Sequence, residues 1–413
     1  MAHDIDEMKT MEKTKESYSS FFNAPFLMLV VYNVFFCMSY GMVGPIMMKY
    51  LVTKGIEMDV AGVIVGVVSI TSLIVRPLSG HLTDHLNQKK LLIVASLLMG
   101  IAMVGIASCS RVPALIFFRV CHGIGFAING TCCIAMATSF MPKDRISEGI
   151  GYFGIANIVS TAIAPTFGLE CANWIGFINT IYIAGGSVLL ASAFLFFFKP
   201  SRNGAQGDAK GQLKDALRTI SLNSIFSVEL LPLALFVAAF SFSNSIVSNY
   251  LALICDERGI TGYSIYFTVN AVVMIVCRPF LGKLNDRKGL SIILYPAFLL
   301  CAAALFLICG AKTIWAILLA SVLKALGQGS GQPALQAECI KRLDTNQRGL
   351  ATSTFYVGSD VANGLGPIIG GMLVTSFGYA KLFEINGFLL IAAFVGYYLY
   401  TKSLQRKKEK KEA

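Results

Sequence analysis

The chain has 413 residues, of which 55% are hydrophobic and only 14% are charged, and its mean hydropathy is +0.67. Ordinary soluble domains hold about 45–50% apolar and about 25% charged residues. This composition excludes a soluble enzyme, a disordered chain and a nucleic-acid-binding domain, even though the formal net charge is +11.

Apolar residues gather in twelve runs, each long enough to cross a bilayer as a helix, which takes roughly 20 residues. The runs leave no room for a separate soluble domain. We therefore predict an all-α polytopic membrane protein with twelve transmembrane helices. The predicted spans are residues 25–50, 59–79, 90–109, 113–140, 149–170, 174–198, 229–253, 264–282, 290–311, 313–338, 349–374 and 380–401.

Basic residues are distributed unevenly between the two predicted sides of the membrane. With both termini in the cytoplasm, the cytoplasmic segments hold 24 of the 34 Lys and Arg residues and the outer segments hold six. This excess follows the positive-inside rule. The charged segment Met1–Asn23 lacks the pattern of a cleaved signal peptide. We expect a multi-pass protein of the cell inner (plasma) membrane with both termini cytoplasmic.

The spans divide into two sets of six, separated by the longest polar segment. In that segment Leu213, Ala216, Leu217 and Ile220 share one helical face, which predicts an amphipathic helix on the inner membrane surface. The predicted organisation is a cytoplasmic N-tail 1–24, an N-terminal six-helix bundle 25–198, a cytoplasmic linker 199–228, a C-terminal six-helix bundle 229–401 and a basic cytoplasmic tail 402–413.

The two sets of six spans repeat one another. The pattern Arg76-Pro-x-x-Gly80-x-Leu-x-Asp84 recurs 202 residues later, from Arg278 to Asp286. Pro165-x-x-Gly168 recurs at the same offset as Pro367-x-x-Gly370. A duplicated six-span unit is typical of transporters that expose a midplane site alternately to the two sides of the membrane. We therefore expect two pseudo-symmetric six-helix bundles.

The loop after span two carries a recognisable motif. Its sequence, Gly80-His-Leu-Thr-Asp84-His-Leu-Asn87-Gln-Lys-Lys90, resembles the signature loop of the major facilitator superfamily. That family normally has Gly where this chain has Asn87, and Asn is among the few other residues that visit the left-handed region. We therefore expect a left-handed turn at Asn87. The second copy, from Gly282 through Asp286 and Arg287, ends with Gly289.

Two further motifs resemble those of the drug–proton antiporter branch of that family. Arg119-x-x-His122-Gly123-x-Gly125 on span four is similar to the branch's intramembrane arginine motif. The antiporter motif is intact on span eleven and degenerate on span five, where it reads Ala-Pro165-Thr-Phe-Gly168-Leu. Residues of these motifs are expected to set close helix packing: Gly123, Gly125, Pro165, Gly168, Gly366, Pro367 and Gly370.

The resemblance implies a gate at the inner ends of spans two and eight. A carboxylate there accepts hydrogen bonds from a helix N-terminus or pairs with a basic residue, and so holds the inner side closed in the outward-facing state. The alternative is that these are ordinary loop acids balanced by their basic neighbours. The expected gating residues are Gly80, Asp84, Lys90, Gly282, Asp286 and Arg287.

Three charged residues stand out because they lie deep within predicted spans, where each costs at least about 2.5–3.5 kcal/mol. They are Arg119 on span four, Lys324 on span ten and Asp360 on span eleven. Asp360 is our proton-carrier candidate, with Arg119 and His122 as further proton-coupling candidates. The alternatives for Asp360 are a static ion pair with Lys324 or Arg119, or a substrate contact. For His122 the alternative is a packing histidine.

Polar residues follow the helix period on several spans, and by resemblance to the family spans one, four, seven and ten surround the central cavity. The candidate substrate contacts are Asn33, Tyr40, Arg119, Phe126, Asn129, Asn244, Ser248, Asn270, Lys324, Gln328, Gln332, Tyr356 and Asn363. Two cations against one acid favour anionic, zwitterionic or neutral substrates.

The sequence thus predicts a secondary active transporter for a small organic solute. Proton-coupled export of an amphiphilic compound or metabolite is the first hypothesis. An organic-anion or zwitterion uptake carrier or exchanger is the alternative. A membrane-embedded enzyme has no support, because no paired carboxylates, metal cluster or Ser/His/Asp set lies at one depth. We expect a monomer in the bilayer, coupled to protons, with no cofactor, metal or nucleic-acid partner.

Overall fold

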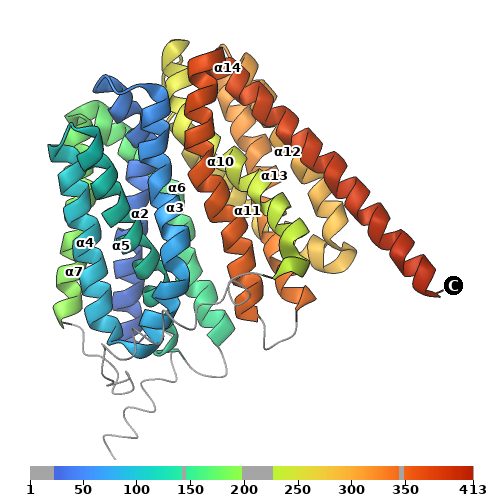
Figure 1. Cartoon of the computed structure of the whole chain (residues 1–413), viewed down its shortest axis with the longest axis horizontal. Helices are drawn as coiled ribbons and strands as arrows, with labels where there is room; N and C mark the ends of the chain where they lie inside the picture. The colour runs from blue at the N-terminus through green and yellow to red at the C-terminus, as the bar shows by residue number, and fades with distance from the viewer. Residues whose placement is uncertain (1–22, 142–145, 198–226, 344–347, 413) are drawn as a thin grey trace, which may run out of the picture. The chain divides into compact units, whose positions relative to one another are not determined.

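The computed structural model describes residues 23–141, 146–197, 227–343 and 348–412, and these are almost wholly helical (Figure 1). Every predicted span lies on a helix, so the predicted fold class is confirmed. The elements are α2 (Ala24–Thr53), α3 (Met58–His85), α4 (Gln88–Ser108), α5 (Val112–Thr138), α6 (Ile146–Ile175), α7 (Phe177–Phe197), η1 (Val228–Leu230), α10 (Leu231–Glu257), α11 (Ile265–Lys288), α12 (Leu290–Gly310), α13 (Ile314–Arg342) and α14 (Arg348–Glu412).

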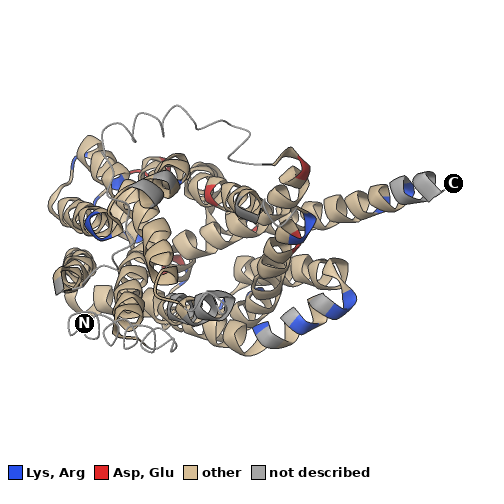
Figure 2. Cartoon of the chain, turned by 90° about the horizontal axis from the view of Figure 1, so that it is seen from below, with Lys and Arg blue, Asp and Glu red and all other residues tan. Residues whose placement is uncertain are grey.

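Nine stretches of the described helices are long and apolar enough to cross a membrane. One of them, Leu350–Arg406, contains the last two predicted spans. The apolar part of α11 is the shorter stretch Ile265–Arg278, and α6 is not among the nine. Figure 2 shows that uncharged residues make up most of the described helices, with only scattered Lys, Arg, Asp and Glu residues.

The last helix bends at a single residue. Gly378 lies within α14 with φ 79° and ψ 170°, a non-helical conformation that separates the two predicted spans. Glycine adopts such a positive φ without the Cβ penalty of other residues. Beyond the bend, the helix continues past the predicted span end at residue 401 and runs through the basic tail to Glu412.

The chain forms two compact units. Unit 1 comprises Met1–Gly41, Ile74–Ala164 and Ile178–Ile220, and unit 2 comprises Met42–Leu73, Pro165–Phe177 and Ser221–Ala413. The predicted division at the linker stays a prediction, because parts of α2, α3 and α6 belong to unit 2. The predicted linker helix at Leu213–Ile220 falls outside the described residues, and so does the predicted N-tail apart from residues 23–24.

The sequence repeat extends to helix packing. In unit 1, a Cβ atom on Gly125 of α5 would lie 2.7 Å from the carbonyl oxygen of Ala95 on α4. In unit 2, a Cβ atom on Gly327 of α13 would lie 2.6 Å from the carbonyl oxygen of Ala297 on α12. Both pairs are related by the 202-residue offset. Small residues therefore allow the same close backbone approach in both copies.

The loop motif turns differently in its two copies. Asn87 has φ −64° and ψ 105°, and its side chain accepts a hydrogen bond from the backbone N–H of Lys90. Asn87 is therefore the N-cap of α4, and the expected left-handed turn is wrong. Its counterpart Gly289 does have a positive φ of 84°. The substitution of Gly by Asn replaces a left-handed residue with a capping residue.

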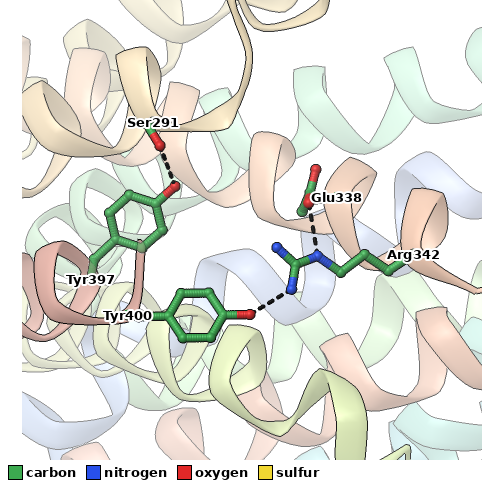
Figure 3. Close-up of polar contacts among 5 residues, drawn as sticks. All are labelled: Ser291, Glu338, Arg342, Tyr397 and Tyr400. Atoms are coloured by element: carbon green, nitrogen blue, oxygen red, sulfur yellow. Dashed lines mark hydrogen bonds and ion pairs between the residues drawn. The ribbon is translucent and has the colours of Figure 1, made fainter. Parts of the chain in front are cut away.

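A polar and aromatic cluster ties the end of α14 to its neighbours (Figure 3). Arg342 Nε lies 2.8 Å from Glu338 Oε1, one turn back on α13. The same guanidinium donates to the hydroxyl of Tyr400 on α14. The hydroxyls of Tyr397 on α14 and Ser291 on α12 lie 3.0 Å apart. These contacts therefore join α12, α13 and α14 of unit 2.

The glycine contact gives the first prediction. Replacing Gly327 with Ala should lower the free energy of unfolding by about 1–3 kcal/mol, because the new methyl group meets backbone of α12. Gly130→Ala on α5 is the matched control, since no described residue of another helix lies within 4 Å of a Cβ there. Thermal unfolding in detergent measures both. Equal midpoints for the two variants would contradict the packing account.

Candidate functional site

Lys324 is a buried cation in the middle of α13. Its side chain is only 2% exposed. Its ammonium donates to Asn244 Oδ1 on α10 at 3.2 Å and to Gln328 Oε1 on its own helix. Among the described residues, no carboxylate lies within ion-pair distance of it. The alternative of a static Asp360–Lys324 ion pair is therefore not observed, and the partners of the ammonium are neutral amides.

A chain of hydrogen bonds leads away from Lys324. Gln328 Nε2 donates to Gln332 Oε1 at 3.3 Å, and Gln332 Nε2 donates to Ser241 Oγ on α10 at 3.0 Å. The Ser241 hydroxyl donates in turn to Ser359 Oγ on α14 at 3.0 Å. All of these bonds run in one direction, away from the positive charge. The chain therefore connects α13, α10 and α14 at the depth of the predicted site.

The chain ends beside Asp360. This acid directly follows Ser359 on α14 and is 7% exposed. One turn further, Asn363 Nδ2 approaches Ser359 Oγ at 3.4 Å, and the Asn363 carbonyl accepts from Ser245 of α10 at 3.2 Å. Tyr356, one turn before Asp360, is 39% exposed. These predicted site residues thus follow one stretch of α14.

The remaining candidates of unit 2 differ in exposure and bonding. Asn244 is exposed and Ser248 is half-buried, so both are accessible on α10. Asn270 of α11 donates to the carbonyl oxygen of Ser321 on α13 at 3.1 Å. That bond holds two helices together, and nothing in the contacts of Asn270 favours its predicted substrate role.

In unit 1, Arg119 and His122 lie together on α5. They are 5% and 1% exposed, respectively. Arg119 Nη1 lies 3.3 Å from His122 Nδ1. Because a guanidinium has only N–H donors, Nδ1 is the acceptor in this hydrogen bond. The imidazole is therefore neutral, with its proton on Nε2. Protonation of His122 would place a second cation beside Arg119. The repulsion between the two charges disfavours the expected proton-relay role of His122.

Three aromatic rings pack beside this pair, and we call them the aromatic shelf: Phe36 and Tyr40 of α2 and Phe126 of α5. Tyr40 stacks on Phe126 with ring centroids 4.2 Å apart and 21° between the planes. Phe36 stacks on the same ring at 5.6 Å. The Tyr40 ring also meets the His122 imidazole edge-on, with the centroids 6.1 Å apart.

Asn129 and Asn33 are both buried among the helices of unit 1. Asn129 is fully buried, and its Oδ1 accepts from Tyr32 of α2 and from Ser96 of α4 at 3.1 Å. Its Nδ2 donates to the Gly125 carbonyl at 2.9 Å. Asn129 therefore joins three helices, and its contacts do not support the predicted substrate role. Asn33 is 4% exposed.

The loop motif is described only in part. Asn87 caps α4, Lys90 and Arg287 are exposed, and a Cβ at Gly80 would meet nothing within 4 Å. The side chains of Asp84 and Asp286, and the surroundings of Gly282, lie outside the description. The inner gate therefore stays a prediction.

Residues of the antiporter motifs lie where helices touch. A Cβ at Gly168 of α6 would overlap the Met42 carbonyl of α2. A Cβ at Gly366 would lie 2.7 Å from Ser245 Cβ of α10, and one at Gly370 would lie 2.5 Å from the Tyr250 ring. The Tyr250 hydroxyl donates to the Pro367 carbonyl at 2.6 Å. The other two motif residues, Gly123 of α5 and Pro165 of α6, are both buried.

Sequence reasoning missed a polar cluster in unit 2, which we call the outer latch because it lies at the predicted outer ends of the helices. Lys49 Nζ of α2 lies 2.6 Å from Asp256 Oδ2 of α10. Lys49 also donates to the Tyr263 hydroxyl at 3.0 Å, and that hydroxyl donates to Asp256 Oδ1 at 3.0 Å. Burial raises the pKa of Tyr263, so the hydroxyl keeps the proton that it donates.

The same latch continues through α6. Thr166 Oγ1 donates to the Ser264 carbonyl at 2.9 Å and lies 2.8 Å from Thr268 Oγ1 of α11. The Ser264 hydroxyl donates to Glu170 Oε1 at 2.5 Å. The only sequence signal was a pair of opposite charges, Lys49 and Asp256, at the predicted outer ends of spans one and seven.

Two stretches of the sequence, residues 29–316 and residues 262–413, match the model of the family described as Major Facilitator Superfamily. The chain belongs to the major facilitator superfamily. It is therefore a multi-pass membrane transporter and not an enzyme. The two overlapping matches cover both copies of the internal repeat.

Several curated relatives match over most of their length. An uncharacterised MFS-type transporter of Methanocaldococcus jannaschii is 23% identical over 86% of this chain and 93% of its own length. The multidrug resistance efflux pump PmrA of Streptococcus pneumoniae is 28% identical, over 78% of this chain and 81% of its own. The multidrug resistance protein MdtG of Dickeya zeae is 24% identical, over 89% and 91%. These relatives confirm the resemblance to the drug–proton antiporter branch.

Solved structures share the fold at lower identity. A bacterial homologue of the human lysosomal transporter Spinster, in an inward-facing and unoccupied conformation, superposes with a TM-score of 0.76 at 15% identity, covering 94% of this chain and 98% of that one. The nucleoside transporter NupG superposes with a TM-score of 0.74 at 11% identity, and the match covers 91% of this chain and 99% of NupG. These likenesses support the major facilitator fold.

The outer latch gives the second prediction. Lys49→Gln, Asp256→Asn and the double variant form a double-mutant cycle, measured by thermal unfolding in detergent. We expect a coupling energy of about 1 kcal/mol, at the upper end for partly exposed pairs, because Tyr263 bridges both charges. The control cycle uses Lys381 and Glu384, a more exposed i,i+3 pair 2.7 Å apart. A coupling energy between Lys49 and Asp256 no larger than that of the control pair would contradict a stabilising role for the outer latch.

Proposed function

We propose that this transporter exports a small amphiphilic compound or metabolite in exchange for protons. It works by alternating access in the plasma membrane, as a monomer with both termini in the cytoplasm. The observation that carries the proposal is the acid Asp360, 7% exposed in α14 of a transporter. Multidrug resistance relatives at 24–28% identity support export as the direction.

Asp360 suits proton exchange for a physical reason. A carboxyl in low dielectric is driven toward its neutral form, and a change in its surroundings restores the charge. Alternating access supplies such a change in each cycle. The neighbouring Ser359 is the end point of the hydrogen-bond chain from Lys324. Asp360 therefore lies one residue along α14 from the end of a hydrogen-bond chain that includes the substrate-site candidates Gln328 and Gln332.

The second candidate is an organic-anion or zwitterion carrier, working by uptake or exchange. One observation favours it: the Lys324 ammonium is buried and has only amide partners among the described residues. A buried cation with no counter-charge is costly, and an anionic substrate group supplies the missing charge. Asn244, Gln328 and Gln332 would then fix the bound group by hydrogen bonds.

In both candidates the outer latch alternates with the inner gate. The latch joins α2 and α6 to α10 and α11 through bonds that are partly exposed and individually weak. Weak bonds suit a gate, because each transport cycle has to break and remake them. We infer that the latch closes the outer side, and that the motif loops of Asp84 and Asp286 close the inner side in the other half of the cycle.

Asp360→Asn gives the third prediction. The variant should lose accumulation driven by a pH gradient, because asparagine carries no exchangeable proton, while substrate exchange across the membrane persists. Proteoliposomes with imposed pH gradients measure both. Glu384→Gln is the matched control, since Glu384 pairs with Lys381 at a helix start. Normal gradient-driven accumulation by Asp360→Asn would exclude Asp360 from the coupling step.

Lys324→Gln gives the fourth prediction. The change removes the buried charge, so an anionic substrate should bind about tenfold more weakly or worse, whereas a neutral analogue should change little. Competition binding to the purified protein measures both ligands. Lys312→Gln is the control, because Lys312 is exposed. Equal weakening of the anionic and neutral ligands would mean that Lys324 has only a structural role.

A further inference from the structure

His122 holds an unused hydrogen-bond donor inside unit 1. Its Nδ1 accepts from Arg119, so its proton is on Nε2. The Nε2 atom is buried and has no hydrogen-bond partner in the described part of the chain. The residue as a whole is 1% exposed.

Such a donor needs an explanation. An unsatisfied buried N–H group costs about 1–3 kcal/mol, and native proteins keep few of them. A simple packing histidine would be expected to satisfy both ring nitrogens. In a transporter, a cargo molecule that carries a hydrogen-bond acceptor would satisfy such a donor.

The side chains around His122 restrict the kind of ligand that can carry this acceptor. The aromatic shelf of Phe36, Tyr40 and Phe126 packs beside the imidazole, with the Tyr40 ring edge-on to it. Tyr40 and Phe126 are both half-buried, so part of the shelf is accessible. Flat aromatic surfaces bind planar rings by offset or edge-on stacking, worth about 0.5–1.5 kcal/mol for each pair.

Charge restricts the acceptor further. The Arg119 guanidinium lies against the other nitrogen of the same imidazole, 3.3 Å from Nδ1. A cation at this position favours a negatively charged acceptor over a neutral one, because the low dielectric strengthens their attraction. It opposes a positively charged ligand for the same reason.

We propose that His122, Arg119 and the aromatic shelf form a subsite for an aromatic carboxylate. The ring stacks on Tyr40 and Phe126, and a carboxylate oxygen accepts from His122 Nε2–H. His122 is thus a specificity-determining residue that binds as the neutral tautomer. The proposal rests on the proposed transport function, and it names the substrate class at this part of the site.

The test is calorimetric binding of 2-naphthoate to the purified full chain in detergent. Wild type should bind the probe, and His122→Ala should bind it about tenfold more weakly or worse, as for loss of a hydrogen bond to a charged group. His122→Gln should recover most of the affinity, because an amide both accepts from Arg119 and donates to the ligand. That recovery separates ligand contact from misfolding.

A second pair of variants tests the shelf. Phe126→Leu should weaken 2-naphthoate binding about threefold to tenfold, as expected for a lost aromatic contact. Phe117→Leu is the matched control on the same helix, because Phe117 is 61% exposed. The saturated analogue decahydro-2-naphthoate should bind to wild type more weakly than 2-naphthoate does. The two ligands should bind to Phe126→Leu with equal affinity.

The outcomes separate this proposal from the transport function. Failure of wild type to bind 2-naphthoate, unchanged affinity in His122→Ala, or preference for the cation 2-naphthylmethylammonium would each overturn the subsite. Proteoliposome flux is measured in parallel. Binding that depends on His122 without any flux of the probe would contradict transport of this class while the subsite stands.

Discussion

The cost of placing ionised side chains among membrane helices governs this structure. Each such group costs at least about 2.5–3.5 kcal/mol, so it persists only where the fold or a ligand stabilises it. Lys324 is held by amide oxygens, and Arg119 by contacts that include a neutral imidazole. The described partners of the Lys324 ammonium are neutral amides and supply no counter-charge, and our proposal of an anionic cargo rests on that observation.

The internal repeat supplies a scaffold on which the two copies have diverged. Gly125 and Gly327 make the same close approach to the neighbouring helix in units 1 and 2. The polar residues beside these contacts differ, however, because one copy carries Arg119 and an aromatic shelf where the other carries Lys324 and an amide chain. The two copies therefore share helix packing and differ in the polar and aromatic side chains that lie beside it.

Run length was enough to predict the membrane helices, because a bilayer fixes helix length and composition. The family was predicted from the resemblance carried by the loop motif from Gly80 to Lys90 and the motif from Arg119 to Gly125. Contacts between distant segments could not be predicted in this way. The latch pair Lys49 and Asp256 is separated by more than half of the chain, and each residue alone is an ordinary charge at a helix end. Asn129 lies on a predicted stripe, yet its amide is used by neighbouring helices. Asn87 stands where the family normally has Gly, and it caps α4 instead of adopting a left-handed turn. Its backbone preference alone does not predict this capping role.

The central claim is that the buried charges couple an organic anion to proton movement. The most direct test is a pH-sensitive dye sealed inside proteoliposomes that hold the wild-type protein, to which organic anions and lipophilic cations are added in turn. The account predicts a change of internal pH that follows the anions, saturates with their concentration and is absent from protein-free vesicles. Proton movement with cations alone, or anion flux with no change of internal pH, would contradict it.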